Sequence, residues 1–193
     1  MNTPSHLILN LAVGTRVARS SAERWAVAVG ALLPDAPMFV FYAWNRGVLG
    51  MPEAVIWEQL YFESAGWRAL FDGFNSFPIL AAVLALCWWR EHRVGALVAG
   101  SAILHCLCDL PIHHDDGHRH FFPLSDWIYA SPVSYWDPAH HGAWISAIEL
   151  AVVAAAARFL WPTLASRVAR GCLLLVVTVY AAGWLGFYGR GLL

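Results

Sequence analysis

The side chains best suited to chemistry lie between His105 and His120, at the end of a long apolar segment. This stretch reads HCLCDLPIHHDDGHRH and holds five of the nine histidines of the chain. Imidazoles and carboxylates are the side chains that bind divalent transition metals. An apolar helix that ends in so many of them indicates a metal site that opens at a membrane surface.

Two more polar residues lie in apolar surroundings near the N-terminus. His6 belongs to the apolar segment 5–17, and Asp35 lies inside the sequence Pro-Asp-Ala-Pro at 34–37. Prolines remove backbone donors, so we expect a helix break there that lines protein or water. An ionisable group so deep in an apolar segment is functional by default. A proline kink with a snorkelling acid is the alternative.

Helix geometry predicts that these polar groups share one layer of the membrane. Counted at 1.5 Å per residue from the arginine-bearing turns, His6 and Asp35 each lie roughly 15 Å into the membrane. From the same side His105 lies at roughly 18 Å and Asp109 at about 24 Å. Scattered polar residues have no reason to converge in this way, so the shared depth favours a common site.

His105 and Asp109 are spaced i, i+4, which places both on one face of a helix. The pair could chelate one ion, or Asp109 could orient His105 by accepting a hydrogen bond from it. The alternative without chemistry is an isolated hydrogen-bonded pair that joins two helices of the bundle.

The loop after Pro111 supplies further candidate site residues. Each of them could be a ligand that turns inward or a residue that stays solvated. His118 and His120 could complete a second metal site, bind a substrate phosphate or carboxylate together with Arg119, or lie on the surface. The candidates for a catalytic acid or base are His113, His114 and Asp115. The candidates for contact with the substrate or with the ligands are Asp72, Asn75, Arg119, His140 and His141.

Composition places the chain among integral membrane proteins, since 59% of its 193 residues are hydrophobic and only 13% are charged. The net charge of -1 and the absence of basic runs argue against a nucleic-acid partner. The four cysteines lie in apolar segments without a Cys-x-x-Cys pair, which is typical of buried free thiols. Motifs of serine hydrolases, nucleotide-binding loops and His-Glu-x-x-His proteases are absent from the sequence.

The pattern of apolar segments predicts an all-α, polytopic transmembrane bundle formed by residues 1–193 as one domain. We expect about four full spans, a short N-terminal membrane helix and interfacial helices. Both of the last two spans are nearly featureless and are expected to serve packing. The predicted parts are a helical hairpin (5–44), an interfacial collar (45–70), two spans (71–112), a His-rich outer loop (113–141) and two more spans (142–189).

The arginines predict the orientation of the bundle. One side carries Arg16, Arg19, Arg24, Arg90, Arg93, Arg158, Arg167 and Arg170, and the other carries Arg46, Arg68, Arg119 and Arg190. Because cytoplasmic loops are enriched in basic residues, the first group is expected in the cytoplasm. The His-rich loop then faces the periplasm or the outside.

Three motifs together resemble the YdjM-like family of bacterial inner-membrane proteins, which are described as metal-dependent hydrolases. They are Thr-Pro-Ser-His at 3–6, Gly-Ala-Leu-Leu-Pro-Asp at 30–35 and His-x-x-x-Asp at 105–109, and the resemblance covers about the first hundred residues. It implies His6, Asp35, His105 and Asp109 as metal ligands, the same four residues that share one depth. The chain departs from the family at 72–76, where Asp-Gly-Phe-Asn-Ser supplies no histidine.

These observations predict a membrane-embedded hydrolase that uses a metal-activated water on an amphiphilic substrate at the outer leaflet. The divalent ion is expected to be Zn²⁺, with Mn²⁺, Fe²⁺ and Mg²⁺ as alternatives. The predicted partner is a membrane lipid or a lipid-linked small molecule, with a phosphoester suggested by location alone, and the sequence does not address the oligomeric state. The alternative function is a non-enzymatic protein that binds, senses or transports metal.

Overall fold

The computed structural model describes residues 1–189, and within them every regular element is helical, which confirms the predicted all-α fold. Short π-helical turns extend two of the helices, and single 3-10 turns follow or precede others. The α-helices are α1 (Thr3–Gly14), α2 (Ser21–Leu32), α3 (Ala36–Tyr42), α4 (Tyr61–Glu63), α5 (Ala65–Phe74), α6 (Phe77–Trp89), α7 (Arg93–Asp109), α8 (Gly142–Leu160) and α9 (Arg167–Tyr188). The π-helical turns are Ala43–Val48 and Val55–Leu60, and the 3-10 turns are Leu110–Ile112, Pro138–His140 and Trp161–Thr163.

Three of these helical segments are long and apolar enough to cross a membrane by themselves: Arg93–Ile112, Gly142–Thr163 and Arg167–Tyr188. Two bent pairs also qualify when each pair is counted as one span, which gives up to five spans in the described residues. The number agrees with the expected bundle of about four spans. The last span begins at Arg167, where the side chain of Ser166 caps its first turn.

The first bent pair confirms the break predicted at Pro34. The helices α2 and α3, the latter with its π-helical extension, meet at an angle of 56°. Pro34 and Pro37 lack the backbone N–H that a continuous helix would need. Asp35 stands at the N-cap position of α3, but its side chain does not cap the helix. Its carboxylate is therefore free to turn toward other elements.

The second bent pair was not expected as a break. The sequence predicts two spans within 71–112, whereas the structure divides the first of them between α5 and α6, with a bend of 44°. Ser76 accepts a hydrogen bond from the N–H of Ile79, and Pro78 lies in the first turn of α6. A serine cap followed by proline starts a new helix, which explains why the polar residues 72–76 do not continue the span.

The helix α7 lies in the middle of the bundle, where it packs against α2 and α6, while α1 packs against α2 and α8. The contact of α2 with α7 is very close at Gly30, where an added Cβ would lie 2.2 Å from the carbonyl oxygen of Val98. Asn10 donates to the carbonyl and hydroxyl of Ser101, and the Ser101 hydroxyl donates to the carbonyl of Val27. A buried polar chain thus joins α1, α7 and α2.

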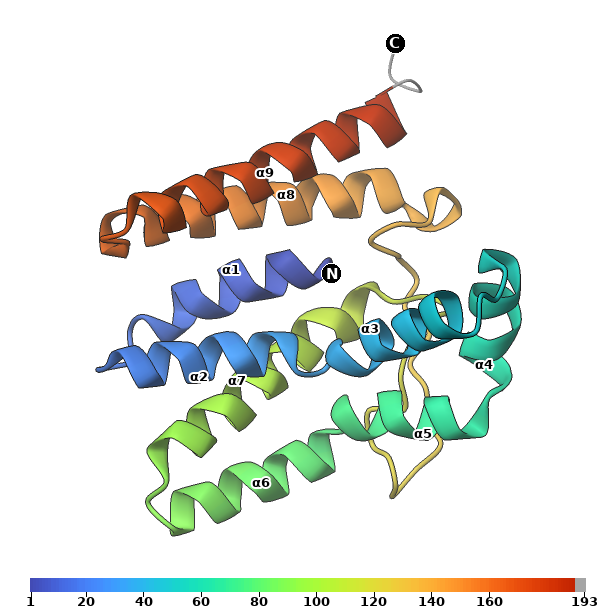
Figure 1. The fold of residues 1–193 in the computed structure, drawn as a ribbon, viewed down its shortest axis with the longest axis horizontal. Helices are drawn as coiled ribbons and strands as arrows, with labels where there is room; N and C mark the ends of the chain where they lie inside the picture. The colour runs from blue at the N-terminus through green and yellow to red at the C-terminus, as the bar shows by residue number, and fades with distance from the viewer. Residues whose placement is uncertain (190–193) are drawn as a thin grey trace.

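The bundle has two chemically different ends (Figure 1). The α1–α2, α6–α7 and α8–α9 connections lie together at one end, and most of the arginines lie at or next to them. The long connection 113–141 and the collar helices lie at the other end. This separation agrees with the grouping of the arginines, including Arg167 and Arg170 in the first turn of α9. Arg190 lies outside the described residues.

Candidate metal centre

Three buried residues from two helices form the centre of the candidate site: His6 of α1, and His105 and Asp109 of α7. One ligand atom from each lies within 4.8 Å of the other two. His6 and His105 are completely buried, and Asp109 is 4% exposed. The two imidazole rings stack with 3.5 Å between their centroids. The predicted convergence of α1 and α7 at one depth therefore occurs in the structure.

The orientation of His105 is fixed by a backbone carbonyl. Its Nδ1 lies 2.7 Å from the carbonyl oxygen of Ala31, so Nδ1 carries the hydrogen and donates it. Ala31 is the second-last residue of α2, and carbonyls in the last turn of a helix lack an intrahelical partner. The Nε2 atom of His105 is left facing the carboxylates of Asp109 at 3.0 Å and Asp35 at 3.5 Å. This arrangement is typical of metal-binding histidines.

Asp109 is the carboxylate around which the histidines gather. Its Oδ1 atom lies 2.9 Å from Nε2 of His6 and 3.5 Å from Nε2 of His113. The amino group of Met1 contacts the same oxygen. The Oδ2 atom faces His105. Because the i, i+4 spacing holds His105 and Asp109 on one face of α7, both can point at the same position in the bundle.

Asp35 reaches the centre from the break between α2 and α3. One of its oxygens faces His105, and the other accepts a hydrogen bond of 2.5 Å from the hydroxyl of Thr3. The break places the carboxylate where a continuous helix would present backbone. The structure thus brings together all four residues that the sequence selected. Thr3 orients one of them and had not been singled out as a candidate.

His113 is the loop residue closest to this group. Its two ring nitrogens lie 3.5 Å from Asp109 and 3.0 Å from Asp116, but neither forms a hydrogen bond of good geometry, although both are buried. Burial of the ring opposes its protonation, but the contacts with Asp109 and Asp116 raise the pKa of His113 to about 9. Burial also opposes ionisation of Asp116, and the contact with His113 lowers its pKa. His113 therefore bridges the centre and the outer loop.

His118 and His120 lie beside the break between α5 and α6. His118 Nδ1 is buried without a hydrogen bond, 3.8 Å from Asp72, and its ring centroid is 6.4 Å from that of His113. His120 donates from Nδ1 to the carbonyl of Asn75 and stacks on Phe77. Burial lowers the pKa of His120. His118 faces toward His113, whereas His120 is held by the backbone of the break.

Arg119 and Asn75 are used in structural contacts. The Arg119 side chain donates to Asp72 over 2.6 Å and to Asp126 over 2.6 Å, which fastens the loop to α5. The Asn75 amide donates to the carbonyls of Pro34 and Phe71, which joins the two helix breaks. These two residues and Asp72 thus hold the walls of the site in place, and a contact with substrate is not needed to explain them.

The remaining candidates lie apart from the centre. His114 donates to the carbonyl of Ser131 and stacks on His140 with 3.5 Å between ring centroids, and His140 contacts Asp137. His141 is exposed and has a left-handed backbone before the first turn of α8. Asp115 is exposed and has no side-chain hydrogen bond within residues 1–189. Of the three proposed acid or base residues, only His113 contacts the centre.

The two carboxylates that bind Arg119 differ in burial, so they test the structural role of Asp72. Asp72 is completely buried, whereas the side chain of Asp126 is 90% exposed. We expect Asp72→Asn to lower the free energy of unfolding by about 3 kcal/mol, because it removes one partner of a buried ion pair. Asp126→Asn is expected to cost less than about 0.5 kcal/mol. Thermal or denaturant unfolding in detergent measures both, and equal costs would contradict the structural role of Asp72.

Glu149 is a polar residue of the core that the sequence reasoning overlooked. It lies on α8, is 4% exposed, and accepts hydrogen bonds from the backbone N–H and side-chain amide of Asn2. It thereby holds the segment that leads into His6. The last spans had been expected to serve packing alone, and an acid inside an apolar span was the signal that could have identified this contact.

The residues present fit a divalent metal ion. The donor set consists of imidazole nitrogens and carboxylate oxygens, as zinc and similar ions prefer. Buried nitrogens on His6, His105 and His113 have no hydrogen-bond partner within the described chain. Unpaired buried polar atoms are rare in folded proteins and call for an explanation such as an ion. A cation bound between His6, His105 and Asp109 would satisfy Nε2 of His105, which faces the Asp109 carboxylate.

Comparison with known proteins identifies the family of the chain. The family model described as YdjM inner membrane protein matches residues 1–190, nearly the whole chain. The match extends well beyond the first hundred residues in which the motifs were recognised. The curated proteins and the solved structures give no match. The chain, an apolar helical protein with a group of residues able to hold a metal, therefore belongs to the YdjM inner membrane protein family.

Proposed function

We propose that this protein is a membrane-embedded metal-dependent hydrolase. His6, His105 and Asp109 hold the ion, and Asp35 is placed to complete the set. Zn²⁺ fits best because two of the donors are imidazoles, while Mn²⁺, Fe²⁺ and Mg²⁺ are the alternatives to be tested. The bundle lies in the bacterial inner membrane, and the end with the His-rich loop faces the periplasm.

The proposal rests on the surroundings of the Nε2 atom of His105. The atom is buried and faces two carboxylates without a hydrogen bond, while Nδ1 is held by the carbonyl of Ala31. A neutral nitrogen lone pair directed at carboxylate oxygens is unfavourable unless a proton or a metal ion lies between them. A bound divalent ion removes this conflict.

His113 is the residue best placed to move a proton in the reaction. It contacts Asp109 inside the centre and Asp116 on the loop side, so one ring nitrogen can face the reacting atoms while the other exchanges its proton outward. A divalent ion bound beside it would acidify water and polarise the oxygen of a scissile ester. The Asp116 carboxylate keeps the ring oriented throughout.

The proposed substrate is a lipid or lipid-linked phosphoester that enters from the outer leaflet. The collar forms an aromatic cluster around Phe41, with Trp57, Tyr61, Trp67 and Phe71. The Tyr61 hydroxyl donates to the carbonyl of Asp116, so the collar is tied to the loop that carries His113. Phe41, Tyr61 and Phe71 are buried in this cluster, whereas Trp57 is exposed and suits the boundary between headgroups and acyl chains.

A second candidate is a protein that binds or senses metal without catalysis. Its support is the complete burial of His6 and His105, because structural metal sites are closed whereas catalytic sites keep an open position. The two functions require the same ligands. They differ in whether the metal-loaded protein turns over a substrate.

Metal analysis and an activity assay separate these possibilities. Detergent-purified wild type is expected to carry about one divalent ion per chain, and His105→Gln is expected to lose it. His114→Gln is the control, since His114 is another histidine of the stretch 105–120 but stacks on His140, apart from the centre. Absence of metal from the wild type, or its retention by His105→Gln, would rule out both functions.

The hydrolase is then tested on phosphatidic acid and on a lipid diphosphate in vesicles. Release of phosphate by the wild type, its loss with chelator and its loss in His113→Gln are the expected results. Metal-loaded wild type that releases nothing from either substrate would instead support the protein that binds metal without catalysis.

A further inference from the structure

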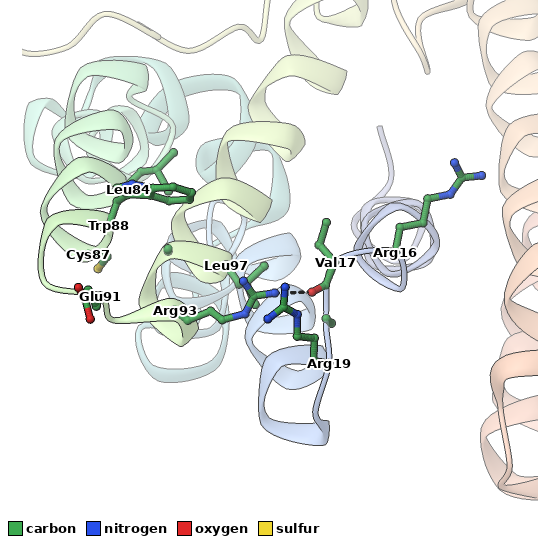
Figure 2. A pocket seen from close by; sticks show the side chains of 11 residues that line it. Arg16, Val17, Arg19, Leu84, Cys87, Trp88, Glu91, Arg93 and Leu97 are labelled. Atoms are coloured by element: carbon green, nitrogen blue, oxygen red, sulfur yellow. Dashed lines mark hydrogen bonds between the residues drawn. The ribbon is translucent and has the colours of Figure 1, made fainter.

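A cavity lies at the arginine-rich end of the bundle, far along the helices from the metal centre. Its volume is about 730 Å³, and its walls come from the α1–α2 connection, the end of α6 and the start of α7. Figure 2 shows Arg19, Val17 and Arg93 around one part of this cavity, with Leu84 and Trp88 across from them. Neither the metal ligands nor the His-rich loop contribute to it.

The polar part of the cavity carries excess positive charge. Three arginines and one glutamate, Glu91, line it. Arg93 donates to Glu23 over 2.7 Å and to the carbonyl of Val17 over 2.6 Å, which leaves its Nη1 donors unused. The guanidinium of Arg19 has no hydrogen bond or ion pair within residues 1–189. These donors are suited to an anion, and guanidinium groups match the geometry of phosphate.

Arg16 contributes less to this anion site than Arg19 and Arg93 do. Its guanidinium points away from the other two in Figure 2 and lies 5.4 Å from the ring centroid of Phe159 on α8. The donors available to a ligand are therefore those of Arg19 and Arg93. Arg19 is the better residue to change in a test, because Arg93 also neutralises the buried Glu23.

The apolar part of the cavity continues into the bundle. A neighbouring groove of about 190 Å³ shares Val17, Ala96 and Leu97 with the cavity and extends along α7 to Gly100 and Leu104. A Cβ placed on Gly100 would meet no atom within 4 Å, so the groove is open at this residue. An apolar groove that begins at two arginines is suited to an amphiphile, with its anionic headgroup at the arginines and its apolar chain in the groove.

We propose that the cavity binds an anionic phospholipid of the surrounding bilayer. Its phosphate lies between Arg19 and Arg93, and one acyl chain follows the groove past Leu97 and Gly100. Trp88, which is 78% exposed, lies at the level of the headgroup, where tryptophan is enriched. Free phosphate would satisfy the arginines, but it would leave the groove unexplained. The site does not depend on the metal centre.

Lipid binding to the delipidated full chain tests the proposal. Native mass spectrometry or thermal unfolding is carried out with phosphatidylglycerol, phosphatidylcholine of the same chains, and inorganic phosphate. Phosphatidylglycerol alone is expected to bind and to stabilise the protein. Arg19→Gln is expected to weaken this binding at least about fivefold, as expected for one arginine at a charged membrane surface. Gly100→Leu is expected to weaken it by filling the groove.

Arg24→Gln is the matched control, since Arg24 is exposed on the same end of the bundle but does not line the cavity. An equal loss in Arg24→Gln and Arg19→Gln would overturn the site in favour of general surface charge. Equal stabilisation by inorganic phosphate, with Gly100→Leu unchanged, would overturn the role of the groove. Equal binding of phosphatidylcholine would show that the arginines do not recognise the headgroup.

Discussion

Asp109→Asn is expected to lower the affinity for divalent metal by more than about 100-fold, since changes outside the ligand set alone cost 10-fold to 100-fold. The amide keeps the shape of the side chain but removes the negative charge that faces His6, His105 and His113. Equilibrium dialysis with metal analysis measures the affinity directly. Thermal unfolding gives a second readout, because a ligand at about 100 times its Kd stabilises the native state by about 2.7 kcal/mol.

The control for this change is Asp137→Asn. Asp137 is also a carboxylate that contacts a histidine, since it lies 2.6 Å from His140. It lies apart from the centre, however. Its substitution is expected to leave the metal content and the stabilisation by metal unchanged. If Asp109→Asn keeps wild-type affinity, Asp109 is not a ligand and the proposed centre is wrong, whatever the activity measurements show.

Gly30→Ala is expected to destabilise the bundle by about 3 kcal/mol, at the upper end of the range for overpacked cores. The new methyl group would lie 2.2 Å from the carbonyl of Val98 and 2.7 Å from Cβ of Ser101. Backbone atoms cannot move aside as a side chain can, so α2 and α7 must separate. Ala31 follows Gly30, so the hydrogen bond from His105 to its carbonyl would lengthen. We therefore expect the metal affinity to fall about tenfold as well.

Gly100→Ala is the matched control on α7. Its Cβ would meet no atom within 4 Å, so the change is expected to be neutral or to stabilise the helix by up to about 1 kcal/mol. Unfolding midpoints of the two variants in the same detergent measure the difference. Similar midpoints for both would show that α2 and α7 do not depend on close contact at Gly30.

The ligand residues were predictable because they are rare. A histidine or an acid inside an apolar segment is costly unless it has a partner, so His6, Asp35, His105 and Asp109 could be recognised one by one. The regular rise of the helix then placed them at one depth without knowledge of the packing. The structure brings these four residues together, with distances of 2.9 to 3.5 Å between the facing side-chain atoms.

The loop residues could not be assigned in this way. His113, His114 and Asp115 are adjacent in sequence, yet only His113 contacts the centre, while His114 stacks on His140 and Asp115 is exposed. A loop has no fixed rise or face from which a direction can be calculated. The path of the loop is fixed instead by hydrogen bonds between distant residues. Arg119 donates to Asp72, 47 positions away, and His114 donates to the carbonyl of Ser131, 17 positions away.

By itself the sequence determined the membrane helices, the break at Pro34 and the four polar residues of the candidate metal centre. These features follow from local causes: hydrophobic length, the missing N–H of proline and the cost of polar groups in apolar segments. Only the tertiary structure decided which nitrogen of His105 is available, which loop histidine reaches the centre, and that Glu149 holds the N-terminal segment. Those outcomes depend on contacts between distant parts of the chain, and the local sequence pattern does not determine the geometry of such contacts.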